Sequence, residues 1–186
     1  MEERITITLP DGAKRLIPKG TKLLEIADEG AAAAQVDGAL VDLSKPLERD
    51  ASISFISVHS RKGLEILRHS AAHVMAQAVK ELFPSVKLTF GPSTEGGFYY
   101  DFDYEKTFTP QDLESIEKRM EEIVKKDEPF IRNEVLKDEA ILTFKKMGED
   151  YKVEHMDDLP NHVSLYRQGS FVDLCEGPHL PSTGKI

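Results

Sequence analysis

The chain has 186 residues, of which 40% are apolar and 31% are charged; this length and composition are typical of one large or two small globular domains and exclude a disordered chain. It contains no apolar run near eighteen residues, its acidic N-terminus does not resemble a signal peptide, and one cysteine excludes a disulfide framework, so we expect a cytoplasmic protein without a membrane span. The net charge of −9 also excludes nucleic-acid binding by phosphate neutralisation alone, so any RNA contact must be local or helped by a further part of the protein.

The first sixty residues predict a small unit built around a hairpin. Alternating and apolar runs predict strands over 5–10, 13–18, two short stretches within 33–47, and 52–58. Asp37-Gly38 predicts a tight turn, and Thr21 is expected to cap a short helix over 22–28. A hairpin, a helix and further strands in this order favour a ubiquitin-like β-grasp fold. We place the domain boundary after residue 61.

The second unit, residues 62–186, opens with a helix over 64–83 that Pro84 ends. Thr109-Pro110 is a capping signal for a helix to about residue 126, and a further helix is expected over 137–147. Strands are predicted over 86–90, 97–103, 130–135, 151–156, 163–166 and 171–175. Strands separated irregularly by helices favour an α+β domain with a mainly antiparallel sheet and a long helix.

Two histidines lie four residues apart on the first long helix. This spacing places His69 and His73 on one face, and the helical wheel puts them nearly opposite an apolar stripe that contains Val74 and Ala78. We therefore expect them outside the core. A solvated pair and a functional pair both fit HSAAH taken alone.

A second pair of potential ligands follows near the end of the printed sequence. Cys175 and His179 stand in CEGPH, and with His69 and His73 they make four soft ligands of the kind that zinc prefers. The spacing is not that of a common zinc finger. A metal-free interpretation fits equally well, because histidines and polar groups can position a water for ester hydrolysis.

Three more polar residues fall on or beside predicted strands. Asp173 shares a strand face with Cys175 if residues 171–175 are extended, Lys152 follows Tyr151 at the start of the predicted strand 151–156, and Tyr100 follows a Gly-Gly turn. Each also has an ordinary structural interpretation, as a turn or salt-bridge residue, a solvated charge and a packed aromatic ring.

Together these features resemble the N-terminal region of a bacterial-type threonyl-tRNA synthetase. The likeness is carried by LRHSAAHVMAQAVKELFP (67–84), GPSTEGGFYYDFDY (91–104), FTPQDLESIEKRMEEI (108–123) and SLYRQGSFVDLCEGPHLPSTGKI (164–186). The first sixty residues, especially VDGALVDLSKPL (36–47), are similar to the TGS domain that precedes the editing domain in that family.

The resemblance implies an editing domain that hydrolyses serine from mischarged seryl-tRNA(Thr), with the charged acceptor end as its partner. Serine lacks one methyl group of threonine, so a threonine pocket rejects it by only about 1–3 kcal/mol and a second, hydrolytic site is needed. His69, His73, Tyr100, Lys152 and Asp173 match catalytic editing positions, and Cys175 and His179 match substrate-binding positions. The roles expected are water and ribose positioning for the histidines, charge stabilisation or leaving-group assistance for Lys152 and Tyr100, and ammonium binding for Asp173.

No cofactor is expected for editing. Zinc at His69, His73, Cys175 and His179 stays an alternative, because alanyl-type editing domains hold zinc in the same cluster. The resemblance also implies that a class II catalytic core and an anticodon-binding domain would follow, so we expect no tRNA charging by this chain. In the full-length enzymes that core forms a homodimer.

Two other functions stay open. One is a non-catalytic module that binds RNA or a regulatory partner, and the other is a zinc-dependent, alanyl-type deacylase.

Overall fold

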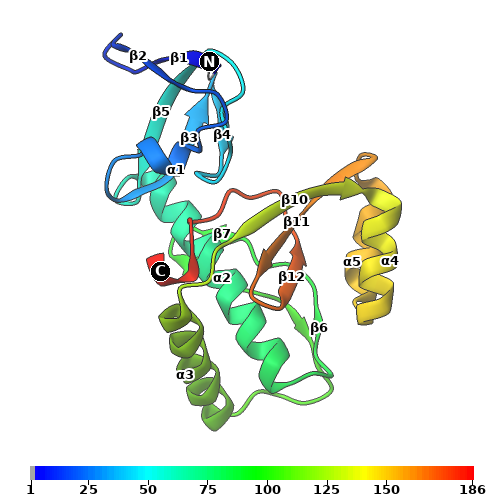
Figure 1. Ribbon diagram of the computed structural model, residues 1–186. Helices are drawn as coiled ribbons and strands as arrows, with labels where there is room; N and C mark the ends of the chain where they lie inside the picture. The colour runs from blue at the N-terminus through cyan, green and yellow to red at the C-terminus, as the bar shows by residue number, and fades with distance from the viewer. Residues whose placement is uncertain (1–2) are drawn as a thin grey trace. The chain divides into compact units, whose positions relative to one another are not determined.

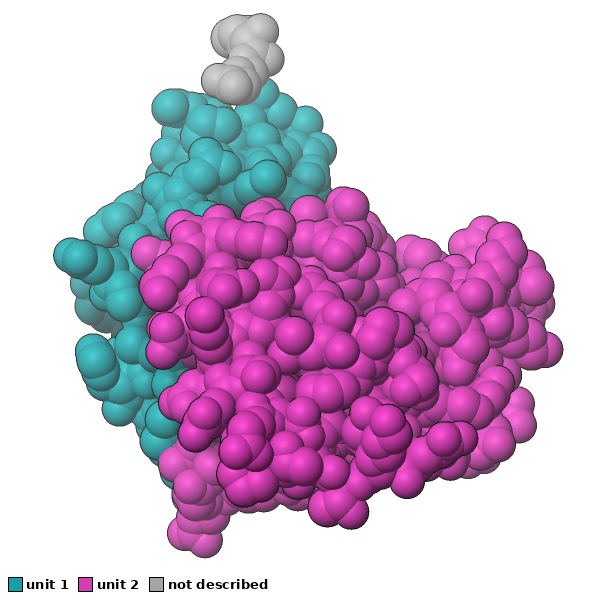
Figure 2. Space-filling model, turned by 90° about the horizontal axis from the view of Figure 1, so that it is seen from below, with its two compact units in different colours: residues 1–67, 177–181 teal, residues 68–176, 182–186 magenta. Residues whose placement is uncertain are grey.

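The computed structural model describes residues 3–186 and divides into two compact units (Figures 1 and 2). Unit 1 comprises residues 1–67 and 177–181, and unit 2 comprises residues 68–176 and 182–186. The expected boundary after residue 61 coincides with the start of helix α2 (Arg61–Leu82), whereas the units divide inside that helix. The reason is that Ile66 is buried with Ala32, Ala33 and Leu180, all of unit 1.

Unit 1 contains a five-stranded sheet of order β2-β1-β5-β3-β4. Its strands are β1 (Arg4–Thr8), β2 (Lys14–Pro18), β3 (Ala31–Val36), β4 (Ala39–Val41) and β5 (Ala51–Ser57). Strands β1 and β5 run parallel, and the other pairs are antiparallel. The turn between β3 and β4 is the predicted one, with positive φ at both Asp37 and Gly38, as the twist of a two-residue hairpin requires.

The helix of unit 1 is shorter than predicted. Helix α1 (Leu23–Ile26) begins after Lys22, whose N–H donates to the Glu25 carboxylate at 3.0 Å. The prediction that Thr21 caps this helix is wrong, because its hydroxyl donates to the Pro18 carbonyl at 2.7 Å and the chain is still extended at Lys22.

Unit 2 combines helices with a three-stranded antiparallel sheet of order β10-β11-β12 (Figure 1). These strands are β10 (Ile131–Leu136), β11 (His162–Gln168) and β12 (Phe171–Leu174). Two short antiparallel pairs precede them: β6 (Lys87–Leu88) with β9 (Phe102–Asp103), and β7 (Ser93–Thr94) with β8 (Gly97–Phe98). The predicted α+β arrangement with mostly antiparallel sheets is confirmed.

The three predicted helices are present. Besides α2, they are α3 (Pro110–Lys126) and α4 (Lys137–Met147), and the Thr109 hydroxyl caps α3 as expected by accepting the Asp112 N–H. Short 3₁₀ turns follow at Met156–Asp158 and Thr183–Lys185. In the part of the chain that the structure covers, no helix has the length and apolar character needed to cross a bilayer.

The predicted strand over 151–156 is wrong. These residues form helix α5 (Asp150–His155) and the start of the following 3₁₀ turn, beside α4 in Figure 1. The alternation of apolar and polar residues suggested a strand, but Val153 and Met156 are three apart, a helical spacing, and pack in one cluster with Phe144.

Helix α2 is buried on most of its circumference from Ser70 to Val79, which corrects the expectation that both histidines lie outside the core. From Ser70 to Val79 every residue except Met75 is buried, so His73 is buried together with the stripe residues Val74 and Ala78. Elements pack on several sides of the helix, and a helical wheel of one segment cannot show how many neighbours it has. His69 is partly buried.

Candidate active site

A cavity of about 620 Å³ lies within unit 2. Its walls come from α2, the β6–β9 region, β10, α5, β11 and β12, and they include His69, His73, Tyr100, Lys152, Asp173 and Cys175. Six of the seven residues that sequence reasoning proposed for the site therefore line one space.

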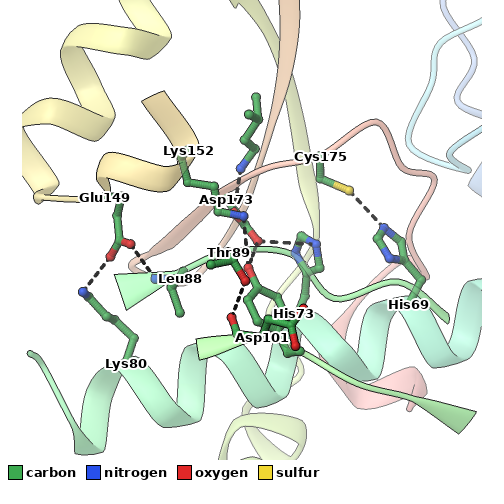
Figure 3. A network of polar contacts seen from close by, with 12 residues as sticks. His69, His73, Lys80, Leu88, Thr89, Asp101, Glu149, Lys152, Asp173 and Cys175 are labelled. Atoms are coloured by element: carbon green, nitrogen blue, oxygen red, sulfur yellow. Dashed lines mark hydrogen bonds and ion pairs between the residues drawn. The ribbon is translucent and has the colours of Figure 1, made fainter. Parts of the chain in front are cut away.

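The inner wall of the cavity carries a buried network around the Asp173 carboxylate (Figure 3). The Lys152 ammonium lies 2.7 Å from Asp173 Oδ1, and the Tyr100 hydroxyl donates to Oδ2 at 2.8 Å. Lys152 Nζ also lies 3.1 Å from the Tyr100 oxygen, so the three groups close a triangle. All three side chains are buried, and Lys152 and Asp173 are only 1% exposed. Such a pair of charges persists in the interior because each neutralises the other.

The ionisation states within the network follow from its geometry. Burial alone would raise the pKa of Asp173, but the Lys152 charge, His73 and the donated hydrogen bonds bring it below its ordinary value. Burial and the nearby Asp173 carboxylate raise the pKa of Tyr100 well above its ordinary value. At neutral pH, Asp173 is therefore a carboxylate and Tyr100 is a protonated donor.

Phe90 places an aromatic face beneath the lysine. The Lys152 ammonium lies 4.4 Å from the centroid of the Phe90 ring, a cation–π distance. Phe90 was not identified as a site residue from the sequence, where it is the last residue of the strand predicted over 86–90. Its place in the cavity wall depends on its contact with Lys152, which is distant in the sequence, so no local pattern predicts it.

His73 faces the same carboxylate as a neutral imidazole. Its Nε2 lies 3.7 Å from Asp173 Oδ2. Burial lowers the pKa of His73 to about 3, helped by the charges of His69 and Lys152 and opposed by Asp173. The ring is consequently available at neutral pH as a neutral hydrogen-bonding group.

His69 and Cys175 form the outer part of the group. His69 Nε2 lies 3.0 Å from Cys175 Sγ, and the His69 and His73 ring centroids are 5.0 Å apart. Burial lowers the pKa of His69, against the opposite effect of Asp173. The ligand atoms of His69, His73 and Cys175 lie within 4.8 Å of one another, and two neutral imidazoles with a cysteine sulfur are a donor set that fits zinc.

His179 falls in the segment 177–181, which belongs to unit 1. There it is 1% exposed, and its N–H donates to the Asp42 carboxylate at 3.0 Å. Its membership of the site stays a sequence prediction.

The rest of the cavity wall mixes polar and apolar side chains, the apolar ones including Leu159, Pro160 and Val163. Arg132 and Glu134, on β10, form an ion pair of 2.7 Å between Nη1 and Oε1, and His155 and His162 lie along the same wall. These residues were not identified from the sequence, where they read as ordinary surface charges. The cavity therefore combines a buried, charged network with a lining of mixed polarity.

The comparisons with known proteins first define a class of domain. Residues 163–186, which contain β12, Asp173 and Cys175, match the model described as "Threonyl and Alanyl tRNA synthetase second additional domain".

Similarity to longer proteins then extends over nearly the whole chain. It is 50% identical to the threonine–tRNA ligase of Geobacter sp. (strain M21), 48% to that of Hyphomonas neptunium and 47% to that of Cupriavidus necator, with 98% of this chain covered in each case. The chain spans about 30% of the length of these relatives. The homologues are thus threonyl-tRNA synthetases, and the chain corresponds to one part of them.

Proposed function

We propose that unit 2 is an aminoacyl-ester hydrolase that removes serine from seryl-tRNA(Thr). The observation that carries the proposal is the buried Tyr100–Lys152–Asp173 network beside two neutral histidines in one cavity. The match of residues 163–186 to an additional domain of threonyl and alanyl tRNA synthetases, and relatives named threonine–tRNA ligase, support the choice of substrate.

The reaction requires a positioned water, a stabilised oxyanion and a protonated leaving group. Water adds to the ester carbonyl carbon, the bond from that carbon to the ribose oxygen breaks, and the proton lost by water ends on the ribose hydroxyl. Free serine and tRNA are the products. Because both imidazoles are neutral at physiological pH, His69 and His73 can accept hydrogen bonds from water and from ribose hydroxyls.

Lys152 and Tyr100 supply fixed donors. Their positions are set by Asp173, so they need little reorganisation when negative charge develops on the carbonyl oxygen. The Asp173 carboxylate accepts from Lys152, Tyr100 and the Leu174 N–H, which leaves one of its roughly four acceptor positions for the ammonium group of serine. Cys175, two residues after Asp173, also lines the cavity. We assign Cys175 and His179 to contact with the substrate.

A zinc ion is an alternative that the donor set permits. His69, His73 and Cys175 would hold it, and when bound it would polarise the attacking water. The hydrolysis that we propose uses the charges of this chain alone, so no cofactor is required.

For unit 1 we propose a TGS-like β-grasp domain at residues 1–61, preceding an editing domain at residues 62–186. Support comes from the sheet order β2-β1-β5-β3-β4, with β1 and β5 parallel at its centre and one short helix after the hairpin. The proposal for unit 2 does not depend on this assignment of unit 1.

Deacylation of a panel of charged tRNAs tests the function. The chain should hydrolyse seryl-tRNA(Thr) faster than threonyl- and alanyl-tRNA, and metal analysis of the purified protein should find no stoichiometric zinc. His73→Ala and Asp173→Ala should lose hydrolysis by about a hundredfold or more. Circular dichroism shows whether each variant is folded under the assay conditions, and the comparison uses only folded protein.

The other outcomes separate the alternatives. Zinc at one equivalent together with preferential alanyl-tRNA hydrolysis would establish the alanyl-type deacylase. Absence of any hydrolysis above the spontaneous rate, with tRNA still bound, would establish a non-catalytic module. Unchanged hydrolysis in both variants would refute the site.

A further inference from the structure

A second ion pair, between a buried carboxylate and a partly exposed lysine, lies beside the Lys152 network (Figure 3). Glu149 is fully buried, its Oε1 lies 2.6 Å from the Lys80 ammonium, and its Oε2 accepts the Leu88 N–H at 2.8 Å. One carboxylate thus joins the start of α5 to both α2 and β6. The mechanism described above makes no use of it.

Glu149 also sets the first turn of α5 through its backbone. Its carbonyl accepts the Lys152 N–H at 3.1 Å, and its own N–H donates to the Phe144 carbonyl at the end of α4 at 3.0 Å. The residue whose side chain is fixed on α2 and β6 is therefore the same residue that begins the turn carrying Lys152. A movement of Glu149 must move Lys152.

The other end of the pair belongs to the helix of the two histidines. Lys80 follows His73 by seven residues, which is close to two turns of α2, so both side chains lie on the same side of the helix. The Lys80–Glu149 contact consequently fixes α5 relative to the face of α2 that presents His73.

We propose that Glu149, held by Lys80, is a positioning residue for Lys152. This role rests on the proposed hydrolytic function. Two exposed contacts of the next residues, Lys87–Asp150 at 2.6 Å and Tyr151–Asp103 at 2.9 Å, help to seat α5 but are surface interactions of small energy. The Glu149 carboxylate is the anchor because it is fully buried, and a buried charge that loses its protein partners cannot be solvated by water instead.

The test uses Glu149→Gln in the whole chain. Glutamine keeps an oxygen for the Leu88 N–H but loses the attraction to Lys80. Well below the midpoint of thermal unfolding, the rate constant for seryl-tRNA deacylation at saturating protein should fall by about tenfold or more, because displacement of a catalytic group by less than an ångström is costly. The protein concentration giving half the maximal rate should change by less than about twofold, because Glu149 does not line the cavity.

A spectroscopic measurement detects the displacement without any activity. The ε-methylene signal of Lys152, assigned by its loss in Lys152→Arg, should shift in Glu149→Gln because the Phe90 ring and Asp173 fix its chemical environment. The matched control is Glu81→Gln, at the residue next to Lys80 on α2. The Glu81 carboxylate forms an ion pair with Arg119 and accepts a hydrogen bond from Gln77. It should change neither the rate nor the signal.

If Glu149→Gln does not fold, Lys80→Gln removes the same attraction from the other side and should give the same two changes. A normal deacylation rate together with an unmoved Lys152 signal would overturn the positioning role. If the wild-type chain hydrolyses no seryl-tRNA, the proposed function fails, and the signal still decides whether Glu149 positions Lys152.

Discussion

At the scale of single residues, the site depends on charges that are kept out of water. Lys152 and Asp173 are each 1% exposed, and neither would be stable in the interior without the other. Tyr100 adds a hydroxyl that contacts both. Removing any one of the three leaves a buried polar group without a full set of partners, so each removal should lower the free energy of unfolding.

His73 makes the stability of the protein depend on pH. Its pKa is about 3 in the folded chain, against 6.5 as the ordinary value. Between these values the unfolded chain binds a proton that the folded chain does not, so the free energy of unfolding falls as pH falls. The slope is about 1.4 kcal/mol per pH unit well below pH 6.5. The lowered pKa of His69 acts in the same direction.

Urea unfolding at pH 7, 6 and 5 measures this effect. In His73→Gln the loss of stability between pH 6 and pH 5 should be smaller than in the wild type by about 1 kcal/mol. His59→Gln, at an exposed position, is the control for the loss of a histidine side chain. Identical pH dependence in His73→Gln and the wild type would mean that His73 titrates normally in the folded protein.

At the scale of secondary-structure elements, α5 is held by its neighbours. Val153 of α5 joins a cluster that includes Phe144 of α4 and Leu165 of β11, while the polar first turn of the helix is anchored by Glu149. Six residues are too few for a helix that is stable alone. The helix that delivers Lys152 therefore exists because α4 and the sheet are present.

Phe144→Ala tests this dependence. The ring is 1% exposed, and its removal should lower the free energy of unfolding by about 3–5 kcal/mol by leaving a cavity under α5. Chemical denaturation of the variant and of Leu142→Ala gives the comparison. Leu142, on the same helix, is 59% exposed, so its truncation should cost less than about 1 kcal/mol. Equal effects of the two substitutions would argue against the cluster as the support of α5.

At the scale of the whole molecule, the chain crosses between its units more than once. It leaves unit 1 within α2, builds unit 2, returns to unit 1 at residues 177–181 and ends in unit 2. Leu180 is 2% exposed and completes a core with Ile66, Ala32 and Ala33. Unit 1 is consequently finished by residues far away in the sequence, and residues 1–61 do not contain all of its core.

Leu180→Ala should therefore destabilise unit 1, although it lies outside the first seventy residues. We expect its free energy of unfolding to fall by about 2–4 kcal/mol, and hydrogen exchange should show faster opening of β3. The control within the same unit is Leu16→Ala on β2, because the Leu16 side chain is 58% exposed. Unchanged exchange in β3 after Leu180→Ala would contradict the assignment of residues 177–181 to unit 1.

Local patterns in the sequence were enough for most elements. The strands of unit 1, the Asp37-Gly38 turn, the Thr109 cap and the limits of α4 all follow from interactions between residues close along the chain. Local patterns failed at α5, where an alternating segment folds as a helix because its apolar residues meet α4. They also failed at Thr21, because the chain stays extended through Lys22 and the helix begins one residue later than a Thr21 cap requires.

The sequence by itself determined the residue types of the candidate site: two histidines one helical turn apart, and a cysteine and an aspartate near one strand. Only the tertiary structure decided that Lys152 and Tyr100 meet Asp173, that His73 is buried and neutral, and that Glu149 anchors the lysine. The physical reason is that burial and the pairing of charges arise from residues tens of positions apart. Spacing fixes which side chains share a face, whereas packing of distant elements fixes which of them lose water and find a partner.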